Sequence, residues 1–181
     1  MAARTNGPGT GRAFLIEARS RLDDVAQLVR HCLGQLDEAQ IWWRPGEGMN
    51  SIGNLVLHLA GNLRQRFEVN VAGRADVRDR FGEFTHREAI PKGELLRRFD
   101  ESVGAADARL GSLAPEALAE ERSVQRGGED VQATVLSIVF QTLMHLAGHA
   151  QEIVYMTRMQ LGDRYSFRTP SLVPPAMRPN G

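Results

Sequence analysis

Two histidines, His145 and His149, lie four residues apart in a stretch whose apolar residues recur every three or four positions. Positions four apart lie on the same face of a helix, so we expect the two imidazoles to point the same way. Such a pair commonly binds a transition metal ion, because neutral imidazole is a good ligand for zinc, nickel and iron. One HxxxH pair is a weak signal, and hydrogen bonding to other buried groups is the alternative for both rings.

A third histidine, His58, lies between Leu57 and Leu59 in a second amphipathic segment, and we expect it to point inward as well. Three protein ligands with an open fourth position are typical of a catalytic metal site, whereas structural zinc sites usually have four protein ligands. The sequence therefore predicts a metal site made of His58, His145 and His149. Zinc is the first expectation, and nickel and iron are the alternatives.

Glu152 follows His149 by three residues and lies on nearly the same helical face. We predict that it acts as an acid or base at the metal site or serves as a fourth ligand. The alternative is a half-exposed carboxylate at the edge of the fold. Gln141 and Asn62 each lie one helical turn from a predicted ligand, where they could hydrogen-bond the second ring nitrogen and fix the tautomer.

The elements that must position these residues are four long amphipathic helices, which predict an all-α four-helix bundle. We expect them at residues 11–39, 51–71, 91–110 and 134–161. Residues 72–90 read as a long polar connection between the second and third helices, and Gly127-Gly128 predicts a small β-hairpin before the fourth. Gly53 and Gly61, two turns apart in the second helix, would let another element approach closely.

We expect a single domain at residues 11–165, between a loose leader at 1–10 and a proline-rich tail at 166–181. The formal net charge is zero, which argues against a nucleic-acid partner. Cys32 is the single cysteine, so no internal disulfide forms and a reducing compartment is indicated. We find no signal peptide and no apolar run of the ~18 residues that a membrane span needs, so we predict a cytoplasmic protein without a membrane partner.

Several motifs, in their order and spacing over residues 11–162, resemble the DinB-like superfamily of four-helix bundles. These motifs are Trp43-Arg44-Pro45, Asn50-Ser51-Ile52-Gly53-Asn54-Leu55-Val56-Leu57-His58-Leu59, Arg80-x-x-Glu83-Phe84, and His145-x-x-x-His149 with Ile153. The resemblance implies helices in up-down-down-up order, metal ligands at His58, His145 and His149, and a homodimer. The chain departs from the pattern where relatives often read His-x-Gly-Gln-Ile, because Glu152 replaces the glutamine.

Characterised members of that superfamily include thiol-dependent transferases and isomerases that use bacillithiol, mycothiol or glutathione-like cofactors. The resemblance therefore implies a metal-dependent transferase or hydrolase. In that reading the metal activates a low-molecular-weight thiol or water to attack a small electrophilic substrate. The alternatives are a non-catalytic bundle that binds a metal or small ligand, related to a stress response, and a structural bundle with an inert histidine cluster.

Overall fold

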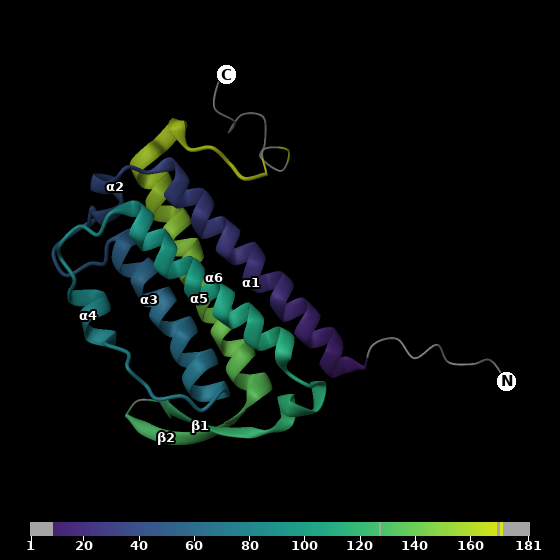
Figure 1. Ribbon diagram of the computed structural model, residues 1–181. Helices are drawn as coiled ribbons and strands as arrows, with labels where there is room; N and C mark the ends of the chain where they lie inside the picture. The colour runs from purple at the N-terminus through teal and green to yellow at the C-terminus, as the bar shows by residue number, and fades with distance from the viewer. Residues whose placement is uncertain (1–8, 127, 170, 172–181) are drawn as a thin grey trace.

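The computed structural model describes residues 9–126, 128–169 and 171. Within this range four long helices pack side by side (Figure 1): α1 (Thr10–Gln35), α3 (Ile52–Arg64), α5 (Lys92–Ser112) and α6 (Val135–Leu161). α1 contacts α5 and α6, and α3 contacts the same two helices, so the four enclose one core. The predicted helical class is confirmed. Most of the predicted leader and of the proline-rich tail lies outside the described residues.

The helix expected at residues 11–39 is divided in two. α1 ends at Gln35, Leu36 is extended, and α2 (Glu38–Trp42) begins after Asp37. Asp37 Oδ1 accepts a hydrogen bond from the Gln40 amide at 2.8 Å, and the Gln40 side chain accepts one from the Asp37 amide at 3.0 Å. An aspartate in this capping box starts a new helix in preference to continuing the old one, and apolar spacing alone does not reveal that break.

α3 begins at a second capping box, in which Ser51 Oγ accepts a hydrogen bond from the Asn54 amide at 3.1 Å. Its last turns widen into η1 (Gln65–Val71), a π-helical segment. The sequence predicted the extent of this helix but not the change of pitch. Such segments are rare and often lie at functional sites.

The connection after η1 contains a short helix, α4 (Arg80–Thr85), which packs against α3 (Figure 1). Asp79 caps it by accepting a hydrogen bond from the Gly82 amide at 2.9 Å. No residue of α4 is buried, which explains why the sequence showed no apolar periodicity here and predicted an irregular connection.

The predicted hairpin is confirmed. After the 3₁₀ turn η2 (Pro115–Ala119), β1 (Glu121–Arg126) pairs antiparallel with β2 (Glu129–Thr134), and Val124 lies opposite Val131. Thr134 then caps α6, which ends at Leu161. Its C-cap is Gly162, with a φ of 54°, and η3 (Gly162–Arg164) begins there. None of the helices in the described part of the chain is long and apolar enough to cross a membrane.

Candidate metal centre

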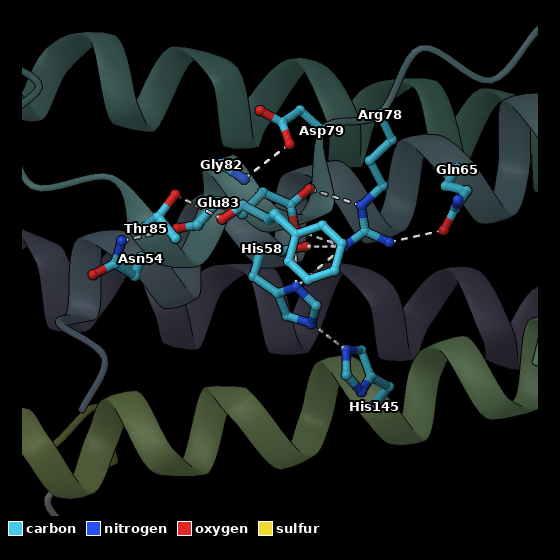
Figure 2. A network of polar contacts seen from close by, with 10 residues as sticks. Asn54, His58, Gln65, Arg78, Asp79, Gly82, Glu83, Thr85 and His145 are labelled. Atoms are coloured by element: carbon cyan, nitrogen blue, oxygen red, sulfur yellow. Dashed lines mark hydrogen bonds and ion pairs between the residues drawn. The ribbon is translucent and has the colours of Figure 1, made fainter. Parts of the chain in front are cut away.

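The three predicted histidines come together between α3 and α6. One nitrogen of each ring lies within 4.8 Å of the corresponding nitrogens of the other two. His58 Nε2 and His145 Nε2 are 2.8 Å apart, and Figure 2 shows these two rings facing each other from their helices. When two imidazole nitrogens bind the same zinc ion at 2.0–2.1 Å, they lie about 3 Å apart. The distance between His58 and His145 therefore suits a shared ion.

The surroundings of His58 fix which of its nitrogens faces the other rings. The His58 side chain is buried, and its Nδ1 lies 3.0 Å from Glu83 Oε2. A carboxylate only accepts hydrogen bonds, so Nδ1 carries a proton, and Nε2 is the nitrogen that faces His145. Arg78 Nη2 also lies 3.1 Å from Nδ1, but it donates to Glu83 Oε2 at 2.7 Å. Arg78 and His58 therefore share one carboxylate, and His58 presents Nε2 to the cluster.

Glu83 and Arg78 form a buried two-bond ion pair behind His58 (Figure 2). Arg78 Nε donates to Glu83 Oε1 at 2.7 Å, and Arg78 Nη1 donates to Gln65 Oε1 at 2.8 Å. Burial alone would raise the pKa of Glu83, but the hydrogen bonds from Arg78 and His58 outweigh it and the pKa lies below its ordinary value. The carboxylate is therefore ionised and acts as a fixed acceptor for His58.

The absence of a side chain at Gly61 leaves the space that the Glu83 carboxylate occupies. A Cβ added at Gly61 would overlap Glu83 Oε1 and lie 2.9 Å from Glu83 Cδ, closer than real Cβ atoms approach. At Gly53 an added Cβ would lie 2.9 Å from the ring of Trp42. The sequence interpretation that both glycines permit close approach is thus confirmed, although the elements that approach are α2 and α4, not another long helix.

Asn54 and Arg44 tie α4 to the start of α3. Asn54 Nδ2 donates to the main-chain oxygens of Glu83 at 2.8 Å and His86 at 3.1 Å. Arg44 Nη2 donates to Asn54 Oδ1 and to the His86 oxygen, both at 2.8 Å. The Phe84 ring lies over His58, with ring centroids 4.6 Å apart. Two of the motifs noted in the sequence therefore hold Glu83 and Phe84 against His58.

His145 is held in its neutral form. Burial, followed by the charges of His149, His58, Arg78 and Arg66, lowers the pKa of His145 to about 4. A neutral imidazole is the form that binds a metal ion.

His149 has its own carboxylate partner. His149 Nδ1 lies 2.8 Å from Glu152 Oε2, and 46% of the Glu152 side chain is exposed. Glu152 is therefore the carboxylate partner of His149 Nδ1, as Glu83 is of His58 Nδ1. In both rings Nε2 is the nitrogen that remains to bind a shared metal ion. The prediction that Asn62 supports His58 is wrong, because Glu83 and Arg78 occupy that position.

Two cavities lie near this cluster. The larger, of 620 Å³, lies over α3, η1 and α5, and it reaches Arg78 and Glu83 but none of the three histidines. The smaller, of 250 Å³, has His145 in its wall together with Asn62 and Arg66. We regard the smaller cavity as the one relevant to chemistry, because it adjoins the candidate ligands.

Comparison with known proteins supports this fold. A family described as "Protein of unknown function (DUF1572)" matches residues 9–171. The crystal structure of a DinB-like protein, YjoA, from Bacillus subtilis is similar with a TM-score of 0.61 and 15% sequence identity, over 80% of this chain and 92% of that one. At this identity the likeness concerns the fold alone, so the comparison shows that the chain has a DinB-like fold. No curated protein matches the chain.

Proposed function

The chain belongs to the DUF1572 family, whose description names no reaction, and from that premise we propose that it is a metal-dependent transferase or hydrolase. His58, His145 and His149 would hold one divalent ion, with zinc as the first expectation and nickel or iron as alternatives. When bound, the ion would lower the pKa of a low-molecular-weight thiol or of water enough for attack on a small electrophilic substrate.

One observation carries the proposal: three ring nitrogens from two helices converge within 4.8 Å of one another. The chemistry of the donor set fits a transition metal, since the set is all imidazole and two rings have their second nitrogen against a carboxylate. Three protein ligands leave room for a thiol or water, as catalytic sites require.

Glu152 has two parts in this proposal. Its Oε2 orients the His149 ring by accepting from Nδ1, and its half-exposed carboxylate can take a proton from the nucleophile. A role as fourth ligand is the alternative that the sequence also allowed. Glu152→Gln separates the two: it would keep a hydrogen-bonding group beside His149 while removing the base, so turnover would fall and metal content would stay.

We also infer that the helices follow up-down-down-up order and that the protein is a cytoplasmic homodimer. The contacts of α1 and α3 with both α5 and α6 support the bundle (Figure 1). A row of exposed apolar side chains along one side of α6 supports a self-association surface. These are Leu136, Phe140, Met144, Tyr155 and Met159, each at least 44% exposed.

Metal analysis of untagged protein tests the site. We expect about one equivalent of metal in the wild type and a large loss in His58→Ala, His145→Ala and His149→Ala. His31→Gln is the matched control, because His31 lies on α1 and contacts the Ser166 oxygen, away from the cluster. Metal retained in all three alanine variants would refute the site.

Turnover tests the reaction. The metal-loaded protein would be offered a panel of small electrophiles with low-molecular-weight thiols, or with water alone. Consumption of an electrophile that stops in His145→Ala supports the enzyme. Full metal content without turnover under any of these conditions would favour the non-catalytic alternative, a bundle that binds a metal or small ligand in a stress response.

A further inference from the structure

Two buried nitrogen atoms beside the C-terminal end of α4, Arg44 Nε and His86 Nε2, have no hydrogen-bond partner among the described residues. Their residues are in direct contact, since Arg44 Nη2 donates to the His86 main-chain oxygen at 2.8 Å. Buried polar atoms nearly always have a partner, because an unpaired one gives up its hydrogen bonds to water and gains nothing in return. Two such atoms in neighbouring residues indicate that a further molecule binds here.

The charge at this place favours an anion over a water molecule. Within the described part of the chain, Arg44 donates only to neutral oxygens, those of the Asn54 side chain and the His86 main chain. Arg87 Nη1 likewise donates to the main-chain oxygens of Phe84 at 2.8 Å and His86 at 3.1 Å. Burial, and then the charge of Arg87, lowers the pKa of Arg44, so the charged group that acts on Arg44 is a second cation. Water can hydrogen-bond an unpaired nitrogen, but it cannot offset two positive charges.

A ligand can reach this place from solvent. Arg87 is exposed, and Arg44 is half-buried in the connection between the end of α2 at Trp42 and the start of α3 at Ile52. Because no helix holds this connection, we expect the Arg44 side chain to turn Nε toward an occupant. The Trp42 ring lies beside His86, with ring centroids 5.4 Å apart, so an indole borders the same place.

We propose that Arg44, His86 and Arg87 bind a phosphate group, either as free phosphate or as part of a phosphorylated small molecule. Two guanidinium groups balance the two charges of a phosphate dianion, and their N–H groups bind phosphate oxygens in pairs. His86 Nε2 supplies a further donor in the tautomer that carries its proton there. A carboxylate has a single charge and would leave one arginine unbalanced. None of the three residues is a candidate metal ligand, so the inference stands apart from the proposed function.

Tryptophan fluorescence reports on this site, because the two tryptophans of the chain, Trp42 and Trp43, directly precede Arg44. Inorganic phosphate would be titrated at about pH 8, where the phosphate group is mainly a dianion, against a sodium chloride blank of equal ionic strength. We expect a saturable fluorescence change that chloride does not produce. Arg44→Gln and Arg87→Gln should each weaken phosphate binding by about 10-fold or more, because each removes a charged donor. Arg64→Gln is the matched control, because Arg64 is exposed and lines the 620 Å³ cavity instead.

Two further titrations separate the sources of the signal. Methyl phosphate that binds as tightly as inorganic phosphate assigns the site to a phosphorylated small molecule, and much weaker binding assigns it to free phosphate. Phosphate binding should persist in His145→Ala, since it does not involve the candidate metal centre.

Three results would overturn the inference: a wild type that responds to phosphate no more than to chloride, acetate that binds as tightly as phosphate, or phosphate binding that is lost in His145→Ala and unchanged in Arg87→Gln. The first two need no variant. Arg87 is exposed, so we expect Arg87→Gln to fold even if Arg44→Gln does not.

Discussion

Gly61→Ala is the sharpest test of how the site is built. The substitution places a methyl group against Glu83, 2.9 Å from Cδ and 3.0 Å from Arg78 Nε. The carboxylate cannot retreat freely, because Arg78 holds both of its oxygens at 2.7 Å and His58 holds one of them at 3.0 Å. The added carbon must therefore displace the ion pair or push α4 away from α3.

The magnitude follows from the burial of that pair. Arg78 and Glu83 are 7% and 10% exposed, and breaking a buried pair costs about 3–5 kcal/mol. Alanine is favoured over glycine inside a helix by about 1 kcal/mol, which opposes the loss. We expect Gly61→Ala to destabilise the protein by about 2–4 kcal/mol, or roughly 4–16 °C in melting temperature for a chain of this length. Metal affinity should fall about 10–100-fold, because His58 loses its oriented partner.

Urea denaturation and metal competition measure the two effects. Gly104→Ala is the matched control: Gly104 lies inside α5 with no atom within 4 Å of an added Cβ, so the variant should be as stable as the wild type or slightly more stable. In a Glu83→Ala background the carboxylate is gone and only the flexible Arg78 side chain remains close to the added methyl group, so Gly61→Ala should destabilise much less. A Gly61→Ala protein as stable as the Gly104→Ala control would refute this account of the site.

Three further predictions concern separate parts of the molecule. Glu83→Gln should weaken zinc binding about 10-fold or more, because His58 loses its carboxylate partner. Asp107→Asn is the control: it removes an exposed ion pair with Arg19 and should leave zinc affinity unchanged. Equal zinc affinities of the two variants in competition assays would contradict the role of Glu83. Met144→Glu, at a position 59% exposed on α6, should give a monomer in sedimentation velocity, and a wild type that sediments as a monomer would reject the homodimer. Burial, and then Cys32, raises the pKa of Tyr165 from 10.0 to about 12, so the unfolded chain loses this proton first. Stability should therefore fall as the pH rises from about 10 to 12, by up to about 3 kcal/mol, and Tyr165→Phe should remove this part of the loss in urea titrations.

The histidine cluster could be predicted because helical periodicity is a local property. His145 and His149 must share a face whatever surrounds them, and the leucines beside His58 indicate its direction. Capping boxes at Asp37 and Ser51 are equally local, although the first was hidden under a continuous apolar pattern.

The residues that hold the histidine rings in position could not be predicted in the same way. Arg78 and Glu83 lie in a connection whose path is decided by tertiary contacts, so only the resemblance drew attention to Glu83. Asn62 lies one helical turn from His58 and could have been its hydrogen-bond partner. In the structure, however, His58 Nδ1 is hydrogen-bonded to Glu83, which lies outside α3. The π-helical turn after Arg64 could not be predicted either, because no residue type signals that change of pitch.

α4 has no buried residue, and it is attached to α3 through the hydrogen bonds of Glu83 with Asn54 and His58 and through the Phe84 ring over His58. We expect α4 to detach at times while the four long helices stay folded. Its amides should then exchange with solvent hydrogen far sooner than those of the core, in a local opening that exposes His58 Nδ1. The lifetime of a bound ion would consequently follow the opening rate of this six-residue segment, and not the much slower unfolding of the whole protein.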